Sequence, residues 1–194
     1  IPRTIALFPW MTISAPIRII SLTCMKRFSN TVSVTTESPP ATAIKAMIWA
    51  GMPYGDWSAP TPEETVKIQK SLDAKIAKFS SHPALWGYIV HDEPGVDKFA
   101  RLAVINQYLL KKDPKHLPFI NLLPNYAGHP DWNGPAYEQS VAKYIDVVKP
   151  ALLSWDHYRQ MFEGGDESYY WKNLEIMRKL SLKAKIPMIQ IIVS

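Results

Sequence analysis

Residues Leu85–Pro94 read LWGYIVHDEP, an apolar run that stops at His91, Asp92 and Glu93 just before a Pro-Gly turn. The length and apolar content of the run predict a buried β-strand. In α/β barrels the reactive groups lie at the carboxyl ends of such strands. Glu93 is therefore the leading catalytic candidate. The competing interpretation is a solvated surface turn in which Asp92 caps the next helix.

Six further apolar runs have the length and the branched or aromatic content of short buried strands. With the first, the predicted strands are Ile5–Trp10, Thr31–Thr35, Ala46–Gly51, Leu85–Val90, Phe119–Leu123, Ala151–Trp155 and Met188–Val193. From the fourth strand onward they recur at roughly thirty residues, which is the repeat of a TIM barrel with its eight βα units.

The segments between these runs carry apolar residues at helical spacing. Thr61-Pro62-Glu63-Glu64 forms a capping box with proline at the first helical position. Four apolar stripes indicate helices: Ile68, Leu72, Ile76 and Phe79; Phe99, Leu102, Ile105 and Leu109; Tyr137, Val141, Tyr144 and Val148; Leu174, Met177, Leu180 and Ala184. Helices that alternate with uninterrupted apolar strands predict a parallel sheet.

A doubly wound open sheet would produce the same alternation, but it usually has a glycine-rich phosphate loop after its first strand. The chain contains no G-x-G-x-x-G or G-x-x-x-x-G-K motif. We therefore predict one catalytic domain over residues 1–194, with the α/β fold of a TIM (β/α)8-type barrel. Seven strands are visible and the eighth unit is missing, so we expect the C-terminus to be truncated. Residues 1–45 are atypical, because Met11–Asn30 shows no clean period.

Composition limits the classes of partner. The 194 residues are 47% hydrophobic and 20% charged, which is ordinary for a soluble domain with one sizeable core. The net charge of +5 is not gathered into a basic stripe, which argues against a nucleic-acid partner. No run of about 18 apolar residues suggests a membrane span, and the first thirty residues lack the features of a signal peptide. The single Cys24 allows no internal disulfide.

Polar and aromatic residues follow the predicted strands at one end only. Pyranose rings stack on aromatic rings while their hydroxyls need polar partners, so this combination favours a carbohydrate site. The substrate-binding candidates are Trp10, Glu37, Trp49, Tyr54, Trp57, His91, Asp92, Asn125, Tyr126, His157, Tyr158 and Gln190. Trp132 is a further candidate for the cleft, whereas Trp86, Trp155 and Trp171 are expected to pack in the core or against helices.

Five segments carry a resemblance to a known family: HPALWGYIVHDEPG, HLPFINLLPNYA, VKPALLSWDHY, YYWKNLEIMRKLSLKAKIP and MIQIIVS. Over Thr31–Ser194 the chain resembles the (β/α)8 glycoside hydrolases related to clan A and the β-galactosidase-like barrels. The resemblance implies a glycosidase acting on a poly- or oligosaccharide, with Glu93 as acid/base and Asp92 in place of the usual Asn. It also implies a secreted or periplasmic protein. The family's nucleophile, a Glu ending the seventh strand, has no counterpart in MIQIIVS.

Glycoside hydrolysis requires a protonated carboxylic acid and a second carboxylate, about 5 Å away in retaining enzymes and about 6.5–9.5 Å away in inverting enzymes. Burial near Trp and the charge of Asp92 would raise the pKa of Glu93. Asp156, which ends the sixth strand, is the candidate second catalytic residue, and its distance across the mouth favours the inverting spacing. Asp156 could instead hydrogen-bond His157 or a substrate hydroxyl. Weaker candidates for the second carboxylate are Glu37, Asp56 and a residue beyond Ser194.

Two other classes remain open. A non-catalytic or degenerate carbohydrate-binding barrel is favoured by the missing seventh-strand Glu. A metal-dependent hydrolase could use His91, Asp92, Glu93, Asp156 and His157 as ligands, although no H-x-H or H-E-x-x-H spacing occurs. We expect neither a cofactor nor a metal.

Overall fold

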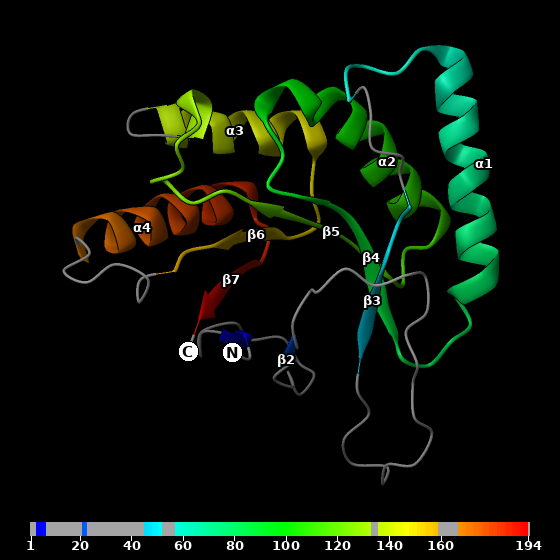
Figure 1. Cartoon of the computed structure of the whole chain (residues 1–194), viewed down its shortest axis with the longest axis horizontal. Coiled ribbons are helices and arrows are strands. Elements are labelled where there is room, and N and C mark those ends of the chain that lie inside the picture. Colours follow the sequence, from blue (N-terminus) through cyan, green and yellow to red (C-terminus); the bar gives the residue numbers. More distant parts are fainter. Residues whose placement is uncertain are drawn as a thin grey trace, which may run out of the picture.

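Five parallel strands in sequence order form the centre of the fold (Figure 1). They are β3 (Ala46–Trp49), β4 (Leu85–Asp92), β5 (Leu117–Leu122), β6 (Leu153–Asp156) and β7 (Met188–Val193). The structure is a computed structural model, and it describes residues 3–6, 21–22, 45–51, 57–132, 136–158 and 167–193. The predicted alternation of helices with parallel strands is confirmed over this central part of the sheet.

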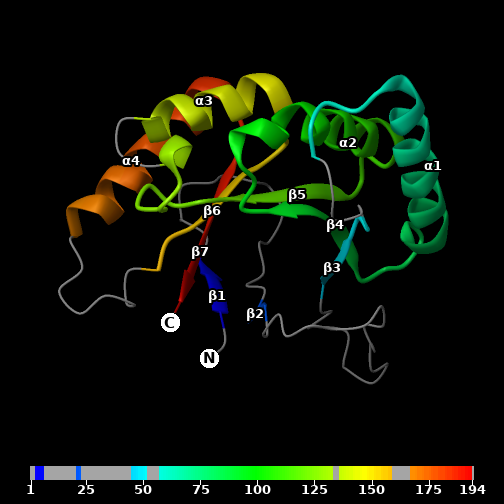
Figure 2. The same cartoon turned by 45° about the horizontal axis from the view of Figure 1, so that its top comes forward.

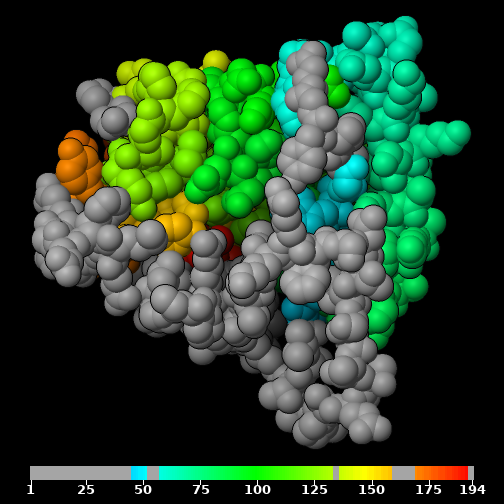
Figure 3. All heavy atoms as spheres, in the orientation of Figure 1, coloured from blue at the N-terminus to red at the C-terminus, as the bar shows by residue number. Residues whose placement is uncertain are grey.

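Four helices connect these strands and lie on one face of the sheet (Figures 1 and 2). They are α1 (Pro62–Phe79), α2 (Phe99–Lys112), α3 (Ala136–Val148) and α4 (Glu167–Ala184), with short 3₁₀ turns at Val96–Lys98 and Pro130–Trp132. Right-handed crossovers between strands in sequential order place every connecting helix on the same side. Helices α2 and α3 are neighbours in this layer, and in the space-filling view the green and yellow-green segments of the chain lie side by side (Figure 3). No helix in the described ranges has the length and apolar content needed to cross a bilayer.

The sheet is open, so the predicted eight-stranded TIM barrel is wrong. Its strand order is β2-β1-β7-β6-β5-β4-β3, in which β1 (Arg3–Ala6) runs antiparallel to β7 and β2 (Ser21–Leu22) runs antiparallel to β1. A TIM barrel requires parallel strands throughout and a stagger that brings the first strand back beside the last. The apolar pattern of a strand indicates that the strand is buried, but it does not indicate how the strand is tilted. Open and closed sheets therefore produce the same pattern.

Most predicted elements coincide with observed ones. The third to seventh predicted strands fall on β3 to β7, and the four apolar stripes fall on α1 to α4. The first predicted strand overlaps β1 at Ile5 and Ala6. The second, Thr31–Thr35, lies outside the described residues.

The main core lies between the sheet and the helices and is rich in large aromatic residues. Its bulkiest fully buried side chains are Trp132, Trp155, Tyr88, Tyr137, Tyr144 and Phe99. Trp132 packs edge-on against Phe99 and Tyr137, so its prediction as a cleft residue is wrong. Trp155 is buried as predicted, whereas Trp171 is exposed and its expected packing is wrong.

A smaller apolar cluster covers the opposite face of the sheet. It contains Ile89, Phe119, Leu152, Ile189 and Ile191. Strands buried on both faces carry apolar side chains in both alternating directions, which explains their uninterrupted apolar sequences.

Strands β4 and β5 approach closely at Gly87. A β-carbon at this position would lie far inside van der Waals contact with the carbonyl oxygen of Leu117. Glycine is thus required by the packing of the two strands. Beyond Gly87, β4 changes register between Ile89 and His91, and bulges of this kind redirect the side chains that follow them.

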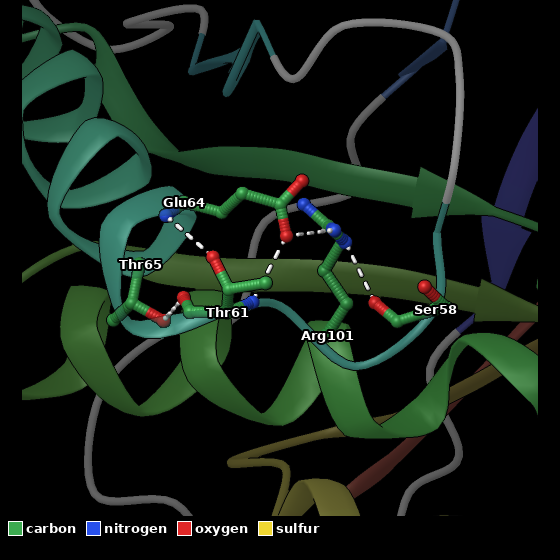
Figure 4. A network of polar contacts seen from close by, with 5 residues as sticks. All are labelled: Ser58, Thr61, Glu64, Thr65 and Arg101. Atoms are coloured by element: carbon green, nitrogen blue, oxygen red, sulfur yellow. Dashed lines mark hydrogen bonds and ion pairs between the residues drawn. The ribbon is translucent and has the colours of Figure 1, made fainter.

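Helix α1 begins with the predicted capping box. Thr61 Oγ1 accepts a hydrogen bond from the Glu64 backbone N–H, and the Thr61 N–H donates to Glu64 Oε2, at 3.2 and 2.9 Å (Figure 4). Arg101 of α2 extends this arrangement: its Nη2 donates to Glu64 Oε2 at 3.2 Å and its Nε donates to the carbonyl of Ser58 at 2.8 Å. This network joins the first turns of α1 and α2.

Candidate functional site

The candidate site lies at the edge of the sheet where the carboxyl ends of β4, β5 and β6 meet. Parallel strands present these ends together. The structure gathers three carboxyl-bearing residues there: Asp92 at the end of β4, Glu93 directly after it, and Asp156 at the end of β6. One amide on β5, Asn121, and one hydroxyl on β6, Ser154, take part in the hydrogen bonds between them.

Asp92 is held by a polar relay that runs across the sheet. Asn121 Nδ2 on β5 donates to Asp92 Oδ1 at 3.2 Å, and Asn121 Oδ1 accepts from Ser154 Oγ on β6 at 3.1 Å. Both Asn121 and Ser154 are buried. The sequence analysis missed them, although a polar residue inside an apolar strand such as FINLL or ALLSW was an available signal.

Glu93 has an unusual backbone conformation. Its φ angle is 51°, in the left-handed region, which costs a non-glycine residue roughly 1–2 kcal/mol. The Glu93 N–H donates to the carbonyl of Asn121 at 2.8 Å, which holds the turn against β5. The side chain is exposed, so the expected burial of Glu93 is wrong.

Asp156 is the buried carboxyl group of the site, with only 4% of its surface exposed. Burial raises its pKa, a hydrogen bond from Tyr158 opposes that rise, and the negative charge of Asp92 adds to it. Asp156 Oδ2 accepts the Tyr158 hydroxyl at 2.7 Å. Oδ1 is buried and accepts no hydrogen bond of normal geometry from the described residues, although the Glu93 and Asn121 side chains approach closely enough to moderate the pKa.

The Glu93 and Asp156 carboxyl groups lie within hydrogen-bonding reach of each other. This contact is closer than the spacing of about 6.5–9.5 Å that an inverting glycosidase uses. The predicted wide separation between the fourth and sixth strands is therefore wrong. β5 alone separates β4 from β6, and the register shift in β4 lies just before the residues that end this strand.

Aromatic rings flank these carboxyl groups. Tyr126 Oη accepts a hydrogen bond from the Tyr158 N–H at 3.2 Å. Burial raises the pKa of Tyr126, the Tyr158 N–H opposes the rise, and the charges of Asp156 and Glu93 add to it. The structure therefore brings Tyr126 and Tyr158 to the carboxyl groups, as the sequence predicted.

His157 follows Asp156 and is also 4% exposed. Its ring meets Tyr126 and Tyr170 edge-on, with centroid distances of 4.8 and 5.2 Å. Burial lowers the pKa of His157, while a hydrogen bond with Asn173 opposes that effect. At neutral pH the imidazole is therefore uncharged.

Two buried amides surround this histidine. The Asn125 N–H donates to Asn173 Oδ1 at 3.1 Å and Asn125 Nδ2 donates to the carbonyl of Tyr169 at 3.0 Å. Gln190 Oε1 on β7 accepts the Tyr170 hydroxyl at 3.3 Å. Asn173, on α4, was missed because it lies within a helix whose periodicity marks only the apolar positions.

The remaining predicted residues are dispersed. His91 and Trp57 contact each other edge-on at 4.6 Å, and burial lowers the pKa of His91. Trp49 is exposed on the edge strand β3. Trp10, Glu37 and Tyr54 lie outside the described residues, as does Asp56. Over the ranges that the structure describes, no three His, Cys, Asp or Glu side chains are grouped to hold a metal.

Comparison with known proteins adds no assignment, because no family model, no curated protein and no solved structure matches the chain. Fold and site together define an α/β domain with an open sheet, which carries carboxyl groups and tyrosines at the carboxyl ends of its strands.

Proposed function

We propose that the chain is a glycosidase domain that cleaves O-glycosidic bonds of a poly- or oligosaccharide by carboxyl-group acid/base catalysis. The observation that carries this proposal is the pairing of an exposed carboxyl group, Glu93, with a buried one, Asp156, whose pKa is raised. Hydrolysis of a glycoside requires a carboxylic acid that remains protonated near neutral pH.

The pair provides such a proton because two carboxyl groups in contact resist ionising together. Asp156, which burial disfavours as an anion, shares one proton with Glu93. Glu93 faces solvent, so it donates that proton to the leaving glycosidic oxygen as the bond to the anomeric carbon breaks. Asp156 contributes to catalysis indirectly, because it shares its proton with Glu93.

A second carboxylate must take up the proton that the attacking water loses. Asp92 lies on the same edge and is held by Asn121. Its exposure makes it accessible to a bound water molecule. We assign it the role of base.

The aromatic residues support a sugar as substrate. Tyr126 and Tyr158 are only partly buried beside the carboxyl groups. Tyrosine offers an apolar ring for the C–H face of a pyranose and a hydroxyl for its oxygens. Recognition by stacking and hydrogen bonds matches the polar and aromatic composition of this edge.

A second candidate function is carbohydrate binding without hydrolysis. The contact between Glu93 and Asp156 favours it, because that pair provides neither the retaining spacing of about 5 Å nor the inverting one. In this alternative the three acidic side chains bind sugar hydroxyls.

The test compares the wild-type chain with Glu93→Gln on β-linked polysaccharides and aryl glycosides, measuring hydrolysis and binding in parallel. We expect Glu93→Gln to lose at least about 100-fold in hydrolysis and to retain binding. Glu175→Gln, at an exposed carboxylate on α4, is the matched control and should leave both unchanged. Binding without hydrolysis by the wild type would support the second candidate, and the absence of both would reject the two.

A further inference from the structure

Asn173 links α4 to the candidate site through three hydrogen bonds. Its Oδ1 faces the Asn125 N–H at 3.1 Å and His157 Nδ1 at 2.9 Å. Its Nδ2 faces the Tyr137 hydroxyl at 2.8 Å, and that hydroxyl donates to the carbonyl of Leu123 at 3.1 Å. Asn173 is completely buried, so these partners account for its polar atoms.

Backbone groups at both ends of this series of hydrogen bonds set the direction of every hydrogen bond in it. The Asn125 N–H can only donate, so the Asn173 atom that faces it is the carbonyl oxygen. The Leu123 carbonyl and the Met177 sulfur, at 3.1 and 3.5 Å, can only accept the Tyr137 proton, so the Tyr137 oxygen accepts from Asn173 Nδ2. Because Asn173 Oδ1 has no proton, His157 Nδ1 must donate to it.

This arrangement determines the tautomer of His157. A neutral imidazole has one N–H, and here the proton is on Nδ1. Nε2 then has a free lone pair. It accepts no hydrogen bond within the described part of the chain. The Tyr126 and Tyr170 rings, edge-on at 4.8 and 5.2 Å, hold the imidazole plane in place.

We propose that Asn173 is a positioning residue that holds His157 as the Nδ1–H tautomer, so that Nε2 accepts a hydrogen bond from a hydroxyl of the bound sugar. The assignment of a sugar hydroxyl rests on the proposed function, whereas the tautomer does not. If Nε2 carried the proton instead, it could only donate to a hydroxyl oxygen and could not accept from the hydroxyl. Asn173 thereby contributes to substrate selection without touching the substrate.

Nitrogen-15 NMR of the histidine rings tests the tautomer directly, and other histidines of the chain supply internal references. His82 Nδ1 accepts from the Ala84 N–H at 3.1 Å, so its proton is on Nε2. His116 Nδ1 faces the Asp113 carboxylate at 2.8 Å and can only donate to it, so the neutral form of His116 has its proton on Nδ1. We expect the His157 pattern to match that of His116. A match with His82 would overturn the proposal.

Two substitutions test the role of Asn173. Asn173→Leu removes the acceptor, and we expect His157 to change to the Nε2–H form while His82 and His116 keep their patterns. Asn173→Asp retains an acceptor oxygen, and it should preserve the Nδ1–H form. An unchanged His157 in the leucine variant would overturn the proposal. If that variant fails to fold, the aspartate variant still decides, because an Nε2–H pattern there contradicts the proposal.

The hydroxyl contact is tested by adding β-1,4- or β-1,3-linked glucose tetramers to the labelled wild-type chain. We expect the Nε2 resonance of His157 to shift on saturation, and Asn173→Leu to raise KM at least about 5-fold with a smaller change in kcat. Saturation without a shift at Nε2 would overturn the contact. If neither tetramer binds and no glycoside is hydrolysed, the proposed function fails, and the hydroxyl contact fails with it. The role of Asn173 in fixing the tautomer is then still supported if His157 shows the Nδ1–H pattern.

Discussion

Tyr158 donates a 2.7 Å hydrogen bond from its hydroxyl to Oδ2 of Asp156, two residues earlier in the chain. This bond favours the ionised carboxylate, whereas burial favours the protonated acid. Burial has the larger effect, so the pKa of Asp156 is raised. The balance between these two effects determines the pH range in which Asp156 holds a proton.

Replacing Tyr158 by Phe should raise the pKa of Asp156 further, because the donor that stabilises the anion is lost. Carbon-13 NMR titration of the side-chain carboxyl carbon measures this pKa. Tyr108→Phe is the matched control, since Tyr108 donates a 2.7 Å hydrogen bond to Asp73 on the helical face, and it should leave the Asp156 titration unchanged. A lower pKa in Tyr158→Phe would contradict the assigned balance.

The raised pKa of Asp156 also predicts how stability depends on pH. Between its ordinary value of 3.8 and its raised folded value, the native state binds more protons than the unfolded state. The stabilisation from this group is thus fully present below pH 3.8 and is lost as pH rises through the folded pKa. Urea unfolding of the wild type and Asp156→Asn over this range measures the effect. The difference in unfolding free energy, wild type minus variant, should fall with increasing pH, and a constant difference would refute the prediction.

Gly87→Ala should lower the free energy of unfolding by about 1–3 kcal/mol, because the added methyl group would overlap the Leu117 carbonyl and force β4 and β5 apart. Urea unfolding monitored by circular dichroism checks this value. Gly128→Ala is the control: a β-carbon there meets nothing within 4 Å, so the change should stay within about 0.5 kcal/mol. Equal effects at the two positions would show that backbone freedom, not the close approach, is responsible.

Arg101→Met should lower the free energy of unfolding by about 1–3 kcal/mol, since it removes the two hydrogen bonds that Arg101 donates to the Ser58 carbonyl and to Glu64 Oε2 (Figure 4). Thermal and urea unfolding measure the loss. Lys179→Met removes an ion pair with Glu138 that is exposed to solvent, and it should have no measurable effect. If Arg101→Met were equally silent, the junction between α1 and α2 would not depend on this network.

The local elements could be predicted because their signals are contained in short segments. The capping box at Thr61 and Glu64 needs only residues three apart, and it is present in the structure as the sequence predicts. Apolar spacing likewise located the four helices and β3 to β7. The competition between an open and a closed sheet could not be resolved this way, because β1 pairs with β7 from the far end of the chain.

At the candidate site, the sequence by itself determined which carboxyl groups end the strands, because the polar residue that follows an apolar run is a local property. Only the tertiary structure decided that Asp156 is buried while Glu93 is exposed. It also brought Asn173 from α4 to His157. Burial and hydrogen bonding depend on neighbours that are distant in the chain, and these neighbours determine where protons reside.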